Sequence, residues 1–133
     1  PLMGTVPLLS DAEAAHDAAA VFDAIRAARN TDHVNNFWRA LAADPALLRA
    51  TWDRAQAVMA PGALDPLVKE LVYIAVSVTN GCAYCTHSHT AAARAKGMTA
   101  EQHGELMAVI AMAAQTNALA TALQVETDDR FLV

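Results

Sequence analysis

Residues 65–97, which read DPLVKELVYIAVSVTNGCAYCTHSHTAAARAKG, decide the fold of this chain. The stretch opens with Asp65, an acid that favours the N-cap of a helix, and Pro66, whose fixed backbone angle suits the first helical position. A nearly continuous apolar run then reaches Asn80, and Gly81 is the residue type with which helices commonly end. The stretch therefore predicts a helix from Pro66 to about Asn80.

A second helix is predicted directly after that glycine. It begins at Cys82 and ends near Lys96 and Gly97. One alternative competes with the first helix, because residues 71–78 are rich in β-branched side chains and also fit a buried strand. The Asp-Pro start and the absence of any partner strand favour the helix. Together the two segments predict a pair of helices joined by a tight turn.

Capping signals and helical periodicity predict four more helices. The first runs from the capping box at Ser10–Glu13 to about Arg29, the second from about His33 to Ala43, and the third from about Pro45 to Met59. The last runs from the capping box at Thr99–Gln102 to about Val125. An irregular acidic tail is predicted from Glu126 to Val133. The sequence therefore predicts an all-α, single-domain bundle of about six helices over residues 1–133, with its core motif at about residues 66–97.

The composition narrows the class of protein. Apolar residues make up 55% of the 133 residues and charged residues 17%, which excludes a disordered chain. The net charge of -5 leaves no basic patch and argues against nucleic-acid binding. No apolar run reaches the roughly 18 residues that span a bilayer, and no signal-peptide pattern opens the chain, so we expect a cytoplasmic protein without a membrane segment. The high apolar share also predicts a homo-oligomer, whose subunits complete one another's core.

The only two cysteines, Cys82 and Cys85, form a C-x-x-C pair at the start of the second predicted helix. Cys85 lies one helical turn after Cys82, and His89 one turn after Cys85, so the three residues share a face. His87 lies about 200° around the helix from Cys85. The unpaired N–H groups of the first turn favour a thiolate, so a cysteine there is expected to have a pKa below the free value of about 8.5. A thiol pair beside a base is equipped for redox chemistry at sulfur.

Glu70 is the acid expected beside that base. From Glu70 to Asn80 the first helix rises about 15 Å, and from Cys82 to His89 the second helix returns about 10 Å. If the two helices are antiparallel, His89 comes level with about Tyr73, within one turn of Glu70. The sequence therefore predicts a contact between Glu70 and His89, direct or through one water, which gives a carboxylate in an apolar helix its partner.

Three other interpretations of the cysteine pair are less favoured. A structural zinc site needs four ligands, whereas only Cys82, Cys85 and His89 converge on one face. Inert core thiols are disfavoured by the helix N-terminal position of at least one cysteine. A thioredoxin fold needs alternating strands and helices, for which the chain has no pattern. We therefore predict no metal and no cofactor.

The chain resembles the alkylhydroperoxidase D-like (AhpD-like) proteins of the carboxymuconolactone decarboxylase superfamily. The resemblance lies in the string Glu70…Asn80-Gly81-Cys82-Ala83-Tyr84-Cys85…His89, within a close match over about residues 66–97. In some members a histidine stands just before the second cysteine, where this chain has Tyr84. The founding type of the family carries two copies of the helical unit, and this chain resembles a single-copy member.

The resemblance implies an all-helical oligomer, a trimer or hexamer, that acts as a peroxidase and disulfide reductase on alkyl hydroperoxides or hydrogen peroxide. Cys85 matches the thiol that attacks the peroxide, and Cys82 matches the resolving thiol that closes the disulfide and meets the reductant. His89 and Glu70 match the proton relay that activates the thiols. The family also implies a dithiol reductant protein, either a lipoylated carrier or a thioredoxin-like protein.

Two other functions stay open at this point. A non-catalytic redox sensor or binding module would use the same disulfide to change an interface. A lactone decarboxylase is less favoured, because superfamily members with that activity generally lack the C-x-x-C pair.

Overall fold

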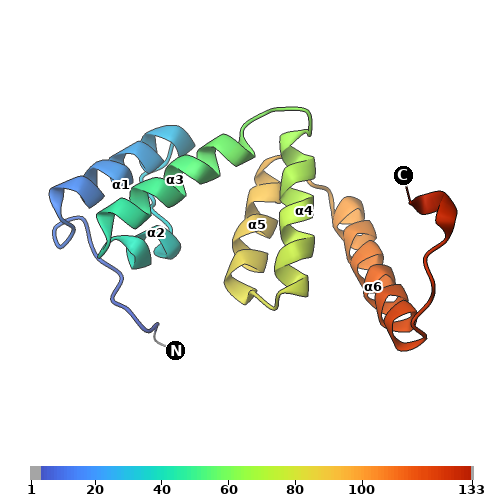
Figure 1. The fold of residues 1–133 in the computed structure, drawn as a ribbon. Helices are drawn as coiled ribbons and strands as arrows, with labels where there is room; N and C mark the ends of the chain where they lie inside the picture. The colour runs from blue at the N-terminus through green and yellow to red at the C-terminus, as the bar shows by residue number, and fades with distance from the viewer. Residues whose placement is uncertain (1–3, 133) are drawn as a thin grey trace. The chain divides into compact units, whose positions relative to one another are not determined.

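The computed structural model describes residues 4–132, and every regular element in this range is helical (Figure 1). The six α-helices are α1 (His16–Arg29), α2 (Asn36–Leu41), α3 (Pro45–Met59), α4 (Pro66–Thr79), α5 (Ala83–Ala95) and α6 (Ala100–Ala122), followed by the short 3-10 helix η1 (Asp129–Phe131). The predicted all-α class is confirmed. Residues 71–78 lie inside α4, so the strand alternative is wrong.

The helices α3, α4 and α6 begin where the capping signals predict. Asp44 and Asp65 each accept a hydrogen bond from a backbone N–H in the first turn of α3 and α4. At α6, Thr99 and Gln102 form a complete capping box. These caps satisfy backbone donors that have no partner within their own helix, which fixes the residue at which each helix begins.

The first helix begins later than its capping box predicts. Ser10 and Glu13 do form the two hydrogen bonds of the box, at 3.1 and 3.2 Å. They close only an isolated turn, because the backbone of Ala15 is extended, with ψ at 158°, and α1 starts at His16. The predicted helix start at Ser10 is therefore wrong.

Ion pairs to distant residues explain why this turn stays separate from α1. Asp11, inside the turn, lies 2.7 Å from Arg26 on α1 and 3.0 Å from Arg39 on α2. The hydrogen bond from Arg26, together with that from Arg39, lowers the pKa of Asp11 to about 2. The turn is thus held by charges from two other elements rather than by continuation of the helix.

The chain divides into two compact units, with the boundary between Ala60 and Pro61. In the first unit, α1, α2 and α3 enclose a buried cluster that includes Phe22, Trp38 and Trp52. The two tryptophan rings meet edge to face, with centroids 5.3 Å apart, a favoured geometry for aromatic pairs. The single domain predicted over residues 1–133 stays a prediction.

The second unit is built on the predicted pair of helices. α4 and α5 lie side by side (Figure 1), around a small core of Ile74, Ala93 and Met98. Two polar residues of α4, Glu70 and Ser77, are also buried. Burial of a carboxylate requires a compensating partner, so the inner face of α4 is a candidate functional site.

α6 is the longest helix, and none of its side chains is buried. Several of its apolar side chains are more than half exposed, including Val109, Met112 and Leu119, and so is Leu123 directly after the helix. An exposed apolar surface of this kind is typical of a contact with another molecule. None of the helices in residues 4–132 combines the length and the apolar character that a membrane span requires.

Candidate active site

Glu70 contacts His89 directly between the two helices. Glu70 is 3% exposed on α4, and its Oε2 lies 2.7 Å from Nδ1 of His89 on α5. The contact predicted from the rise of two antiparallel helices is confirmed. Because an ionised carboxylate only accepts hydrogen bonds, we assign the proton to Nδ1, which donates it to Glu70. This tautomer leaves a free lone pair on Nε2 of His89.

Lys96 is a second partner of Glu70 that the sequence analysis missed. Its Nζ lies 2.6 Å from Oε1, so the two carboxylate oxygens of Glu70 have different partners. One signal was present in the sequence: Lys96 follows His89 by seven residues, which is two helical turns and therefore nearly the same face. A lysine stem is long enough to reach a carboxylate from that distance.

The two partners keep Glu70 ionised. Burial alone raises the pKa of Glu70, but the hydrogen bonds from His89 and Lys96 and their charges outweigh burial and lower it. Glu70 therefore carries a full negative charge at neutral pH. A fixed buried charge next to an imidazole orients the ring.

Tyr73 covers one face of the His89 ring. The two rings are stacked, with centroids 3.5 Å apart and planes 18° apart. Burial raises the pKa of Tyr73, and the nearby charges of Cys85, Glu70 and Cys82 raise it further, so the phenol stays protonated. Tyr73 therefore lies against His89 as a neutral phenol.

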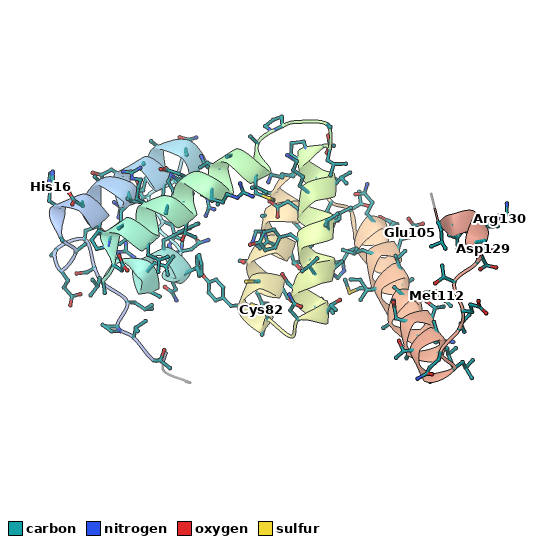
Figure 2. All side chains as sticks on the ribbon, viewed as in Figure 1. His16, Cys82, Glu105, Met112, Asp129 and Arg130 are labelled. Carbon is teal, nitrogen blue, oxygen red and sulfur yellow. The ribbon has the colours of Figure 1, made fainter. Side chains whose placement is uncertain are left out.

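The turn between α4 and α5 sets the position of the first cysteine. Gly81 has a left-handed backbone, with φ at +71°. Its N–H donates to the carbonyl of Val78, and the N–H of Cys82 donates to the carbonyl of Ser77. These two bonds form a Schellman motif, which favours glycine because a side chain strains this backbone. Cys82 follows as the N-cap of α5, at the turn end of the two helices (Figure 2).

The two cysteine sulfur atoms differ in their affinity for a proton. Sγ of Cys82 accepts a hydrogen bond from the backbone N–H of Cys85, at 3.3 Å. A bond from the Cys85 thiol, together with this N–H and that of Tyr84, lowers the pKa of Cys82. The thiol bond, burial and the charge of Cys82 raise the pKa of Cys85 to about 11. The expected low-pKa thiol of the first turn is therefore Cys82, while Cys85 holds the shared proton.

A shallow surface depression of about 350 Å³ opens beside the first cysteine. It is lined by Ser77, Val78, Gly81, Cys82, Ala83, Thr86 and His87. His87, which the sequence places away from Cys85, thus faces the surface next to Cys82. Cys82 is therefore reached from solvent through this depression.

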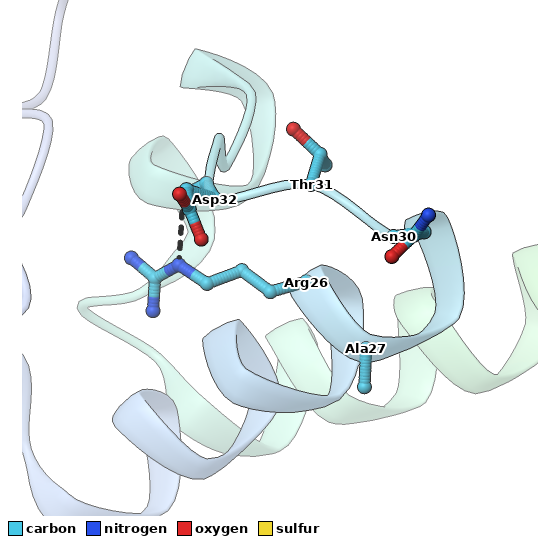
Figure 3. A pocket seen from close by; sticks show the side chains of 5 residues that line it. All are labelled: Arg26, Ala27, Asn30, Thr31 and Asp32. Atoms are coloured by element: carbon cyan, nitrogen blue, oxygen red, sulfur yellow. Dashed lines mark hydrogen bonds between the residues drawn. The ribbon is translucent and has the colours of Figure 1, made fainter.

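A larger depression, of about 480 Å³, lies in the first unit at the end of α1 (Figure 3). It is lined by Arg26, Ala27, Asn30, Thr31 and Asp32. The guanidinium of Arg26 donates from Nε to the carbonyl of Asp32 at 2.9 Å and pairs with Asp11. Arg26 therefore has a structural role, since it links α1 to Asp32 and to Asp11. None of the predicted site residues lines this depression.

Known proteins match both the sequence and the structure. Residues 45–128, more than half of the chain, match the carboxymuconolactone decarboxylase family. Alkyl hydroperoxide reductase AhpD of Solibacter usitatus (strain Ellin6076) is 39% identical over 71 residues, which are 53% of this chain and 38% of that protein. The match with this relative thus spans less than half of the relative's own length. A crystal structure of the alkylhydroperoxidase AhpD core from Rhodospirillum rubrum ATCC 11170 is 60% identical, with a TM-score of 0.95 and coverage of 98% of both chains.

The family match includes the two helices that hold Glu70, both cysteines and His89. The high TM-score shows that the all-helical architecture is that of the AhpD core as well. The chain therefore belongs to the carboxymuconolactone decarboxylase family, among its AhpD-like members.

Proposed function

We propose that this protein is a thiol-dependent peroxidase and disulfide reductase that reduces alkyl hydroperoxides or hydrogen peroxide. The observation that carries the proposal is a C-x-x-C pair at a helix start, one helical turn from a histidine that contacts a buried carboxylate. The names of two relatives, an alkyl hydroperoxide reductase and an alkylhydroperoxidase core, support the same reaction class.

The first step of the proposed reaction removes a proton from the thiol pair. Nε2 of His89 takes the proton of Cys85, one turn away, while Glu70 stabilises the imidazolium through Nδ1. The proton that remains, that of Cys82, passes to the sulfur of Cys85 in the resting pair, because the pKa of Cys82 is lowered and that of Cys85 is raised, and the charge rests on Cys82. Transfer of this proton to Cys82 places the charge on Cys85, the attacking thiol in this proposal.

The second step cleaves the peroxide. The Cys85 thiolate attacks the terminal oxygen of ROOH, so that the S–O bond forms, the O–O bond breaks and RO⁻ leaves. The imidazolium of His89 protonates the leaving alkoxide to ROH and returns to the neutral form. Sulfur is oxidised to a sulfenic acid, and the peroxide is reduced to an alcohol, or to water when the substrate is hydrogen peroxide.

The third step closes a disulfide. The sulfur of Cys82 displaces hydroxide from the sulfenic acid of Cys85, and the proton of the Cys82 thiol completes the water that is released. Two thiols and one hydroperoxide thus give one disulfide, one alcohol and one water. The depression beside Cys82 supports access of a dithiol reductant protein, a lipoylated carrier or a thioredoxin-like protein, which restores the two thiols by exchange.

We also propose that the protein assembles with copies of itself, as a trimer or hexamer. The support is α6, a helix of 23 residues without a buried side chain. The outer positions Val68, Val72 and Val76 of α4, spaced four residues apart, are exposed as well. Both surfaces are apolar enough to be stabilised by burial against another subunit.

The test is peroxide consumption by the reduced protein. With cumene hydroperoxide or hydrogen peroxide we expect loss of two thiols for each peroxide consumed, and continued turnover when a dithiol such as dihydrolipoamide is supplied. The control is the variant Cys82→Ser/Cys85→Ser, which lacks both thiols. A protein that is oxidised once without turnover would be a redox sensor instead, and a protein whose thiols survive both peroxides contradicts the proposal.

A further inference from the structure

The buried carboxylate of Glu70 is shared between two nitrogen bases of different kinds. Oε2 faces Nδ1 of His89 at 2.7 Å, and Oε1 faces Nζ of Lys96 at 2.6 Å. The side chain of Glu70 is 4% exposed, compared with 23% for His89 and 37% for Lys96. The carboxylate is therefore cut off from water and depends on these two residues for its charge compensation.

The backbone places Lys96 at this carboxylate. Lys96 is the C-cap of α5, and the following Gly97 has φ at +99°. The N–H of Gly97 donates to the carbonyl of Arg94, and the N–H of Met98 donates to that of Ala93, which is again a Schellman motif. Met98 and Ala93 are buried in the same core cluster. The stem of Lys96 therefore starts from a fixed point at the end of the helix.

We propose that Lys96 is a positioning residue for His89: its ammonium balances the charge of Glu70, so that His89 stays neutral and keeps Nε2 free to accept a proton. The proposal rests on the proposed function only where it takes His89 as the base for Cys85. With Lys96 present, the ammonium, the carboxylate and a neutral imidazole sum to zero charge. Without Lys96, only protonation of His89 can balance the charge of the carboxylate.

A base that is already protonated cannot take the thiol proton, so the lysine preserves the reactive form of His89. The other titratable groups around His89 do not replace this effect. Tyr73 stacks on the ring as a neutral phenol. Cys82 and Cys85 hold one negative charge between them once a proton has left, which favours protonation of His89 rather than opposing it. Among these neighbours Lys96 is the one that opposes protonation of the imidazole.

The proposal is tested by the protonation state of His89 in Lys96→Met, read from imidazole ¹⁵N chemical shifts at pH 7. The chain has five histidines, so the His89 signals are assigned by their absence in His89→Gln. We expect the ratio of protonated to neutral His89 to rise about tenfold in Lys96→Met, since loss of a nearby like charge favours the protonated form. Lys96→Arg, which keeps the charge, should restore the wild-type ratio.

A matched control is Arg94→Met, which removes a positive charge from an exposed position of the same helix. Equal ratios in Lys96→Met and Arg94→Met would overturn the proposal, since a merely structural lysine changes stability without changing the protonation of His89. Because no peroxide is used, this result is independent of the proposed peroxidase activity.

Charge removal after folding covers the case in which Lys96→Met fails to fold. The sequence has lysine only at positions 69 and 96, so acetylation of folded Lys69→Arg protein neutralises Lys96 alone among the lysines. Acetylation is expected to raise the protonated fraction of His89 as Lys96→Met does. An unchanged fraction after complete acetylation, verified by mass, also overturns the proposal.

Discussion

Replacement of Glu70 by glutamine tests the centre of the proposed relay. Glu70→Gln keeps the shape of the side chain and removes the charge that both His89 and Lys96 contact. A hydrogen bond to a charged group contributes about 1.5–3 kcal/mol to stability. The Lys96 side chain is 37% exposed and can turn to water, so most of the loss falls on the contact with His89. We therefore expect the free energy of unfolding to fall by about 2 kcal/mol.

The effect on chemistry is expected to be larger. The glutamine amide can donate as well as accept a hydrogen bond, so it no longer enforces the Nδ1–H tautomer of His89, and it has no charge to stabilise the imidazolium. Oxidation of the thiol pair by peroxide should therefore slow roughly 100-fold, the usual size of a lost general base. Stopped-flow measurement of thiol loss gives this rate, and urea unfolding gives the stability. Glu105→Gln, an exposed carboxylate on α6 (Figure 2), is the matched control. Thiol oxidation in Glu70→Gln within threefold of wild type would refute the proposed relay.

The stability lost in Glu70→Gln is expected to depend on pH. The pKa of Glu70 is lowered in the folded protein, with burial opposed by the bonds from His89 and Lys96. A lowered carboxyl pKa adds stability above the unfolded value of about 4.3, and this stability is lost as the pH falls through the folded pKa. The stability difference between wild type and Glu70→Gln should thus be largest near pH 6 and narrow below about pH 4. A difference that grows toward low pH would contradict this sign.

Three further predictions concern the thiols, the turn and the assembly. Cys85→Ser should not react with peroxide, whereas Cys82→Ser should stop at a sulfenic acid on Cys85 that dimedone traps; the reverse pattern would exchange the roles of the two thiols. Gly81→Ala should lower the free energy of unfolding, measured in urea, by about 1–2 kcal/mol, because Gly81 has a left-handed backbone. Gly104→Ala should raise it by up to about 1 kcal/mol, because Gly104 lies in α6 with open space around it. Light scattering at micromolar concentration should give a multiple of 14.0 kDa that Leu119→Lys reduces; a wild-type monomer would exclude the assembly.

The parts of the fold that could be predicted are those set by local backbone chemistry. Asp65 and Gly81 determine where α4 begins and ends through bonds within a few residues. Once both helices are fixed and antiparallel, helical rise brings Glu70 within one turn of His89. The sequence therefore contained enough information to place the acid and the base opposite one another.

The parts that could not be predicted depend on partners far along the chain. The turn at Ser10 has a complete capping box, yet Asp11 pairs with Arg26 and Arg39, and no local pattern reveals these pairs. Lys96 was missed because a flexible lysine side chain has no fixed direction before its partner is known. The unequal pKa values of Cys82 and Cys85 arise from a hydrogen bond between the two thiols, which depends on rotamers rather than on spacing.

The use of a cysteine as a helix cap links the stability of α5 to the oxidation state of the protein. As a thiolate, Cys82 is a charged acceptor for the N–H of Cys85, whereas a sulfur atom in a disulfide is neutral and accepts hydrogen bonds only weakly. Oxidation therefore weakens the bond that starts the helix, and the folded backbone stabilises the dithiol relative to the disulfide. Stabilisation of the reduced form raises the reduction potential of a thiol pair. In the proposed reaction the first turn of α5 thus favours an oxidising disulfide, one that passes its oxidation readily to an incoming dithiol.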